Sequence, residues 1–182
     1  MICEGDWHNL YKRDYDLQVP ESRSHPAKMG WDLCFRILAH LQELELLREG
    51  DTVLDPMAGT GRTALAACSL GYRAATVELE EKFVSFQKAN LEYASRKLGR
   101  QLDWTILQGD ARNLSELVKL TCKAVMSPSY QTGEGDSIWN RNRQVVANSY
   151  AVPDSIQIKK GYGTTPGQIG NMKDRPLKAV LS

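Results

Sequence analysis

Two carboxylates flank a glycine-rich turn that could bind a ligand through its backbone. Asp55 directly precedes the turn PMAGTG (residues 56–61), and Glu78 closes the next apolar run of the chain. A glycine turn between a strand and a helix lets the backbone approach a ligand closely and points helix N-terminal amides at it. The same turn could be a tight connection without a ligand, and the glycines by themselves do not decide between the two.

The places of the two carboxylates favour a ligand that has a ribose and a positive charge. A carboxylate at the end of the second strand, such as Glu78, can accept hydrogen bonds from both ribose hydroxyls. Asp55, just before the glycines, suits an ammonium or sulfonium group and would repel a pyrophosphate. S-adenosylmethionine has these groups and no phosphate, so we predict it as the cofactor in preference to NAD. The alternative for Glu78 is a solvated residue at a helix start, as we expect for Glu80 and Glu81.

Two later segments carry residues that could hold a planar base. Asp110 in LQGDAR could accept from an adenine amino group while the Ala111 amide donates to the ring, or it could be a helix N-cap. In KAVMSPSY, Pro128 makes a turn from which Tyr130 would project to stack on a base. The alternative is a turn in which Tyr130 packs on the core.

The elements that must position these residues alternate between strands and helices. Such alternation predicts an α/β fold with a parallel, doubly wound sheet flanked by helices. The side chains at positions 55, 78, 110 and 127 then fall at the carboxyl ends of strands, where ligands of such sheets bind. We expect helices over 31–47 (ended by Gly50), 62–71, 80–99 and 113–120, and strands over 52–55, 74–78, 104–110 and 123–127.

Composition places the chain among ordinary globular domains. It has 182 residues, and its formal net charge of +1 excludes binding to nucleic acid or membrane mainly through bulk positive charge. The cysteines lie far apart and predict reduced thiols of a cytoplasmic protein, with Cys122 in the core and no metal site. No run is apolar enough for a membrane span.

Taken in order, the motifs resemble a known family. DPMAGTG, the strand end at Glu78, GDA and SPSY are similar to the amino-methyltransferases that modify N4 of cytosine or N6 of adenine in DNA. The segment SHPAKMG resembles the His-Pro-x-Lys segment of that family, which contributes to the methionine end of the cofactor. The resemblance covers roughly residues 22–130 and implies a Rossmann-like fold that binds S-adenosylmethionine.

The resemblance also assigns residues to roles. It implies a DNA substrate, whose target base flips out of the duplex, and the Ser-led turn favours cytosine N4 over adenine N6. Ser129 replaces the second proline of the family signature, so we expect weaker catalysis. Implied in catalysis are Ser127, Pro128, Ser129 and Tyr130, and implied in cofactor binding are His25, Lys28, Asp55, Pro56, Met57, Ala58, Gly59, Thr60, Gly61, Glu78, Leu79, Asp110 and Ala111.

The region after Tyr130 is interpreted as a loop-rich tail. We expect a single domain over 1–182, made of an N-terminal segment (1–30), a core (31–130) and this tail (131–182) that is shorter than in the family. DNA contacts could come from basic and aromatic residues of the tail: Arg141, Arg143, Lys159 and Lys160, with Trp139 and Tyr162. A solvated polar tail is an equally good interpretation of them.

Three alternatives stay open at this point. RNA or protein glutamine could be the substrate, although those families have Asn where this chain has Ser127. The chain could be a cofactor-binding subunit without activity alone, whose unpaired sheet edge associates with itself or a partner. A nicotinamide-binding dehydrogenase half is disfavoured by Asp55 and by Ala64 at the third glycine position.

Overall fold

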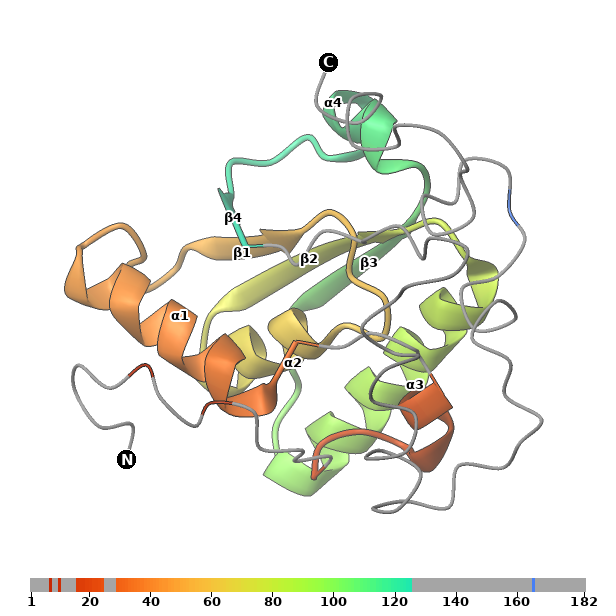
Figure 1. The fold of residues 1–182 in the computed structure, drawn as a ribbon, viewed down its shortest axis with the longest axis horizontal. Coiled ribbons are helices and arrows are strands. Elements are labelled where there is room, and N and C mark those ends of the chain that lie inside the picture. Colours follow the sequence, from red (N-terminus) through yellow and green to blue (C-terminus); the bar gives the residue numbers. More distant parts are fainter. Residues whose placement is uncertain (1–6, 8–9, 11–15, 25–28, 126–164, 166–182) are drawn as a thin grey trace, which may run out of the picture. The chain divides into compact units, whose positions relative to one another are not determined.

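The four predicted strands form one parallel sheet. The computed structural model describes residues 7, 10, 16–24, 29–125 and 165, and Figure 1 shows the sheet at its centre. The strands are β1 (Thr52–Asp55), β2 (Arg73–Glu78), β3 (Trp104–Gln108) and β4 (Lys123–Ala124). Their order is β3-β2-β1-β4, and all three pairings are parallel.

The strand order places a topological switch beside β1. The chain runs outward from β1 through β2 to β3, and then crosses to the other side of β1 to form β4. The Val125 amide continues this last pairing by donating to the Leu54 carbonyl at 2.8 Å. A reversal of strand order at β1 is the mark of a doubly wound sheet and confirms the predicted fold class. The crevice that binds ligands in such sheets lies at the end of β1, where Asp55 stands.

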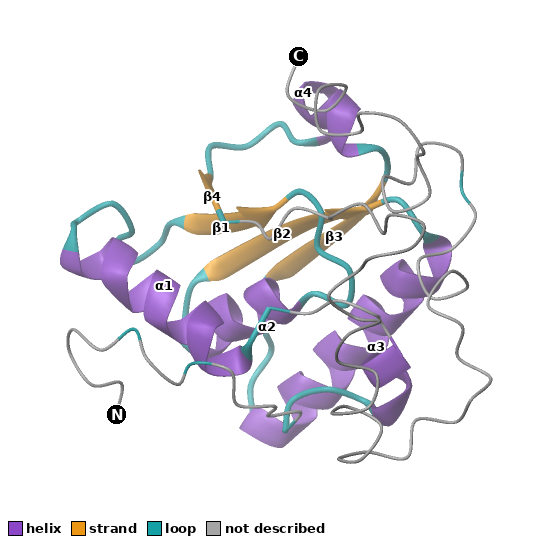
Figure 2. Cartoon of the chain, in the orientation of Figure 1, coloured by secondary structure: helices purple, strands orange, loops and turns teal. Residues whose placement is uncertain are grey.

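Three helices pack on one side of this sheet. Figures 1 and 2 show α1 (Trp31–Glu43), α2 (Arg62–Ser69) and α3 (Glu81–Leu98) on the same side. α2 packs on β1 and β2, and α3 packs on β2 and β3. The short elements are η1 (Pro20–Ser24), η2 (Ala111–Asn113) and α4 (Leu114–Leu117). All these elements lie within Met1–Pro128, the first of two units into which the chain divides.

Small side chains let α2 pack closely on α1, on α3 and on the sheet. Ala64, Ala66, Ala67 and Cys68 are almost fully buried. They contribute to two apolar clusters, one around Trp31, Leu65 and Trp104 and the other around Leu38, Leu47 and Val53. Burial at this scale is the main favourable term in folding, and here it fixes α2 between α1, α3 and the sheet.

The end of α1 differs from the prediction. The spacing of apolar residues predicts a helix to residue 47, stopped by Gly50, but α1 ends at Glu43. Glu45 adopts a left-handed backbone with φ of 57°, and the amides of Leu46 and Leu47 both donate to the Leu41 carbonyl. This capping turn brings Leu47 into the core, whereas Leu44 is 53% exposed. Leu44 fits the helical spacing of the apolar residues, but it lies beyond the end of α1 and is exposed.

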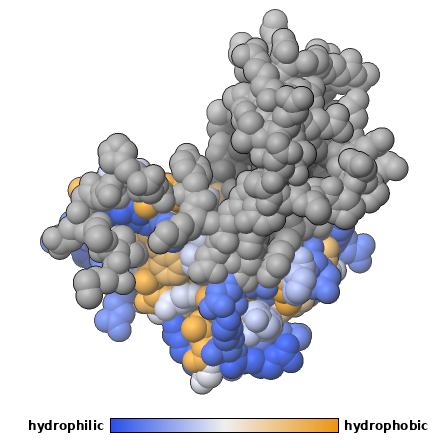
Figure 3. Space-filling view, turned by 60° about the horizontal axis from the view of Figure 1, so that its bottom comes forward, coloured by the Kyte–Doolittle hydropathy of each residue, from blue (hydrophilic) through white to orange (hydrophobic). Residues whose placement is uncertain are grey.

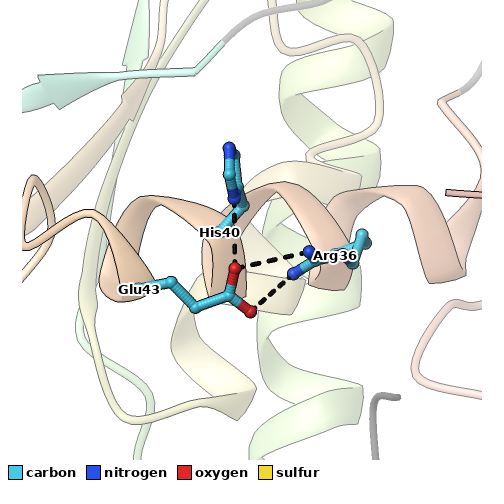
Figure 4. Close-up of polar contacts among 3 residues, drawn as sticks. All are labelled: Arg36, His40 and Glu43. Atoms are coloured by element: carbon cyan, nitrogen blue, oxygen red, sulfur yellow. Dashed lines mark hydrogen bonds and ion pairs between the residues drawn. The ribbon is translucent and has the colours of Figure 1, made fainter. Parts of the chain in front are cut away.

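A charged cluster lies on α1 (Figure 4). The Arg36 guanidinium donates to both carboxylate oxygens of Glu43, at 2.7 and 3.3 Å, and His40 Nδ1 lies 3.1 Å from the same carboxylate. The Arg36 side chain is buried, and its guanidinium carbon lies 4.8 Å from the centre of the Trp7 ring. The ion pair and the aromatic ring together offset part of the cost of burying this cation, whose Nε has no hydrogen-bond partner among the described residues.

The described surface is mixed in polarity. On the face that Figure 3 draws, hydrophilic residues alternate with smaller hydrophobic areas. Among the described helices, none is long and apolar enough to span a bilayer.

Candidate functional site

The turn after β1 folds back onto the end of β2. Within it, the Ala58 amide donates to the Val77 carbonyl at 3.2 Å, and the Gly61 amide donates to the Ala58 carbonyl at 2.8 Å. The turn then enters α2 at Arg62, with Gly61 as the N-cap. The ends of two parallel strands and the start of a helix therefore meet at one place, as the sequence predicts.

Glu78 links the glycine turn to the start of α3. Its side chain accepts from the Gly59 amide at 2.7 Å through one oxygen and from the Glu80 amide at 2.9 Å through the other. Glu78 is 8% exposed, and burial raises its pKa to about 7 against the opposing effect of these amides. The lone pairs of the carboxylate outnumber the three backbone amides that lower this pKa, those of Gly59, Leu79 and Glu80, so the group can still accept from a ligand hydroxyl.

Asp55 is the second buried carboxylate of the site. It is 4% exposed and accepts from the Met57 amide at 3.1 Å. Burial raises its pKa to about 6, although the Met57 amide and the Thr63 hydroxyl act in the opposite direction. Two buried carboxylates whose charge is poorly compensated stand on neighbouring strands, a pattern that is concentrated at functional sites.

Side chains of α3 hold the carbonyls of the turn. Gln87 donates to the Gly59 carbonyl at 2.8 Å, and Asn90 donates to the Thr60 carbonyl at 3.0 Å. Gln87 also accepts from the Thr76 hydroxyl at 2.6 Å. The motifs do not single out these residues, but one signal could have found them: both are polar and lie on the buried face of α3, with Phe83, Val84 and Ala94.

Asp110 lies on the loop after β3 and is the N-cap of η2. Its carboxylate accepts from the Arg112 amide at 2.9 Å and forms an ion pair with the Arg112 guanidinium, and this contact lowers its pKa. The Gly109 amide donates to the Glu78 carbonyl at 3.0 Å, which places this loop beside the end of β2. The capping alternative is thus observed, while the adenine contact stays a prediction.

Two expectations about single residues are wrong. Glu80, expected to be solvated, is 6% exposed because it is the N-cap of α3 and its amide is bound to Glu78; Glu81 is exposed. Cys122, expected in the core, is only half-buried because it precedes β4, a strand of two exposed residues.

Part of the predicted site lies outside the described residues. This holds for His25 and Lys28, for the predicted catalytic turn Ser127–Tyr130, and for the basic and aromatic candidates of the tail. Asp110 and Ala111 lie on the loop after β3. The structure brings together the remaining predicted cofactor residues at the ends of β1 and β2: Asp55, Pro56, Met57, Ala58, Gly59, Thr60, Gly61, Glu78 and Leu79. Among the described residues no cluster of His, Cys, Asp and Glu could hold a metal ion.

The fold and this site define a Rossmann-like α/β domain. Residues 5–89 match the family N6_N4_Mtase, described as DNA methylase. This part of the chain carries the sequence pattern of the amino-methyltransferases, which confirms the resemblance that its motifs indicate. The matched residues include the glycine turn and Glu78, and they end before Asp110 and Ser127.

The chain is similar in arrangement to parts of several solved structures. TrmN from Thermus thermophilus is 24% identical with a TM-score of 0.47, over 60% of this chain and 31% of that one. The C-terminal domain of precorrin-6Y C5,15-methyltransferase from Rhodobacter capsulatus is 21% identical with a TM-score of 0.43, over 69% and 63%. An rRNA methylase from Streptococcus thermophilus is 14% identical with a TM-score of 0.42, over 66% and 63%. The chain therefore spans less than a third of TrmN and less than two thirds of the other two.

Proposed function

We propose that the chain binds S-adenosylmethionine at the ends of β1 and β2 and methylates an exocyclic amino group of a DNA base. The observation that carries the proposal is the buried Glu78 carboxylate, bonded to the Gly59 amide of the turn. It stands where a ribose is held in Rossmann-like sheets. The match of residues 5–89 to DNA methylases supports the reaction and the substrate class.

The chemistry of the described residues fits this cofactor. Glu78 offers acceptors for ribose hydroxyls, and Asp55 offers a negative charge for an ammonium or sulfonium group. Both carboxylates are buried and have raised pKa values, so a cationic ligand would stabilise their charged forms. The same negative charges would repel a pyrophosphate. Asp110 and Ala111, on the loop beside β2, complete the proposed set on the adenine side.

The proposed catalytic step rests on Ser127, Pro128, Ser129 and Tyr130. S-adenosylmethionine supplies an activated methyl group when it is bound. Ser127 accepts hydrogen bonds from the target amine, which localises the nitrogen lone pair. Tyr130 stacks on a base that has flipped from the duplex. Catalysis then comes from positioning and electrostatics. Among the two amines of the family, we propose cytosine N4.

Calorimetric titration with S-adenosylmethionine, S-adenosylhomocysteine and NAD tests the cofactor. We expect saturable binding of the first two ligands and none of NAD. Glu78→Gln should weaken binding at least about tenfold, because it removes a charged acceptor. The exposed Glu92 of α3 provides the control variant Glu92→Gln, which should bind normally. Binding of NAD alone would overturn the proposal.

Transfer of a labelled methyl group tests the substrate. The chain is incubated with labelled S-adenosylmethionine and duplex DNA, RNA or protein, and the DNA is digested to identify the methylated nucleoside. We expect N4-methylcytosine, lost in Tyr130→Ala. Label in RNA or protein alone would reassign the substrate, and cofactor binding without any transfer would favour a subunit that is inactive alone.

A further inference from the structure

A segment far from the glycine turn in sequence is bonded to it in the structure. This N-terminal anchor comprises residues 16–22, and it includes the start of η1, which packs on α3 (Figure 1). Leu17 is buried in the cluster around Trp31 and Trp104, and Lys97 of α3 forms an ion pair with Asp16. The anchor is thus a fixed part of the fold, next to the helix whose side chains hold the turn.

Gln18 connects the anchor to Thr60 of the turn and to Arg62 through three hydrogen bonds. Its amide nitrogen lies 3.4 Å from the Thr60 hydroxyl, at the middle of the turn. Its amide oxygen accepts from Arg62, at 2.7 Å from Nη2 and 3.3 Å from Nε. Arg62 is the first residue of α2 and also donates to the Met29 carbonyl at 2.9 Å. Gln18 therefore bonds to residues on both sides of Gly61.

Asn90 makes the second connection between the anchor and the turn. Its side-chain oxygen accepts from the Val19 amide at 2.9 Å, while its nitrogen donates to the Thr60 carbonyl at 3.0 Å. Thr60 is therefore held through its hydroxyl by Gln18 and through its carbonyl by Asn90. The three side chains are at most 2% exposed.

Buried polar contacts of this kind specify one geometry. Apolar packing would avoid the cost of burying amide groups, whereas a satisfied polar network fixes the orientation of each member. Here the network orients the carbonyls of Gly59 and Thr60 toward α3 and leaves the Gly59 amide directed at Glu78.

We propose that Gln18 and Asn90 are positioning residues for the cofactor: the seated anchor sets the shape of the glycine turn that binds it. This inference rests on the proposed function. Neither residue needs to touch the cofactor, because both act through Thr60. Loss of either connection should weaken cofactor binding without removing any group that the cofactor contacts.

The test compares two substitutions of similar size at position 18. Gln18→Met removes the bonds to Arg62 and Thr60. Gln18→Glu keeps an acceptor for both, since the Thr60 hydroxyl can donate to a carboxylate. We expect S-adenosylhomocysteine to bind Gln18→Met about tenfold more weakly than the unaltered chain, and Gln18→Glu within about twofold of it. Gln42→Met, at an exposed position of α1, is the matched control.

A second readout separates positioning from general loss of stability. Hydrogen exchange is measured for the peptide over residues 56–65, at a temperature well below the unfolding midpoint of each variant. Gln18→Met and Asn90→Leu should speed exchange of the turn amides, and Gln18→Glu should not. A variant that melts earlier but keeps both the slow exchange and the normal affinity would overturn the inference.

The outcomes also distinguish this inference from the proposed function. If the unaltered chain does not bind S-adenosylhomocysteine, both the proposed function and the inference are wrong. If it binds, and Gln18→Met and Asn90→Leu bind as tightly, the inference alone is wrong. Weaker binding in Gln18→Met with rescue in Gln18→Glu supports both.

Discussion

At the scale of single residues, Gly61 is required on two independent grounds. Its φ of 78° lies in the left-handed region, and an added Cβ would lie 2.3 Å from ring atoms of Trp104. The Trp104 indole is held in place on β2, because its N–H donates to the Thr76 hydroxyl at 2.9 Å. The close approach of β3 to the turn therefore excludes any side chain at this position.

Gly61→Ala should destabilise the chain by roughly 3 kcal/mol or more, since overpacking adds to the left-handed strain. Gly71→Ala separates the cost of overpacking from the cost of the left-handed backbone. Gly71 has φ of 93°, but nothing lies within 4 Å of the position of its Cβ, so only the backbone term of about 1–2 kcal/mol applies. Urea unfolding measures both variants, and equal losses would show that Trp104 moves aside at little cost.

The two buried carboxylates predict a dependence of stability on pH. The pKa of Asp55 is raised to about 6 and that of Glu78 to about 7, above the ordinary values of 3.8 and 4.5 for these groups. A raised pKa in the folded state favours folding at low pH, and this contribution is lost as pH rises through the folded pKa. Relative to Asp55→Asn, the unaltered chain should lose on the order of 2 kcal/mol between pH 4 and pH 7. Urea unfolding across this range measures the difference, which should not change with pH if the prediction is wrong.

The same carboxylates predict the pH dependence of ligand binding. A cationic ligand prefers ionised carboxylates, so S-adenosylmethionine should bind more tightly at pH 7.5 than at pH 5.5. Calorimetry at the two pH values measures the change. The gain in affinity should be smaller in Asp55→Asn, and an equal gain in this variant would show that Asp55 does not face the positive charge.

At the scale of elements, the helices combine apolar packing with a few buried polar contacts that set their ends and neighbours. α1 is an example, because the Arg36–Glu43 pair spans its last two turns while Arg36 itself is buried. The Arg36 guanidinium, followed by His40, holds the pKa of Glu43 below its ordinary value. The ion pair therefore contributes to stability only while Glu43 is ionised.

Glu43→Gln should lower the thermal midpoint at pH 7 and have little effect in acid. A lowered pKa in the folded state means stability that is present above the ordinary pKa and is lost as pH falls through the folded one. Thermal unfolding at pH 7 and below the carboxyl range measures this difference. Glu92→Gln on α3 is the control, and a loss of equal size at both pH values would assign the effect to packing of the side chain.

At the scale of the whole molecule, the strands of the sheet differ in how much of each is buried. β1 is buried at all four of its positions, and β2 at five of six, whereas both residues of β4 are exposed. β4 joins β1 through two register pairs, Val53 with Lys123 and Leu54 with Ala124. Within the described part of the chain, opening of β4 thus breaks fewer backbone pairings than separation of β1 and β2.

Native-state hydrogen exchange should reflect this order. We expect amides of β1 and β2 to exchange only on global unfolding, and the Val125 amide, bound to Leu54, to exchange by local opening. The test compares exchange rates of these amides with the global unfolding rate in low urea. Equal protection of Val125 and Leu54 would indicate that β4 unfolds together with the centre of the sheet.

The sequence alone determined that the four strands are present, though not where β3 ends, and it determined the parallel α/β class and the meeting of Asp55, Glu78 and the glycine turn. These features follow from local patterns, because apolar periodicity and glycines specify elements and parallel strands bring their carboxyl ends to one edge. It also predicted the end of α3 at Gly99, a left-handed C-cap.

Only the tertiary structure decided which distant side chains complete the site. Gln18 of the anchor and Gln87 and Asn90 of α3 form hydrogen bonds to the turn. The ring of Trp104, on β3, packs against Gly61. The end of α1, the burial of Glu80 and the raised pKa values of Asp55 and Glu78 were decided in the same way. The physical reason is that burial and polar pairing depend on how the helices pack on the sheet, and no local pattern records that packing.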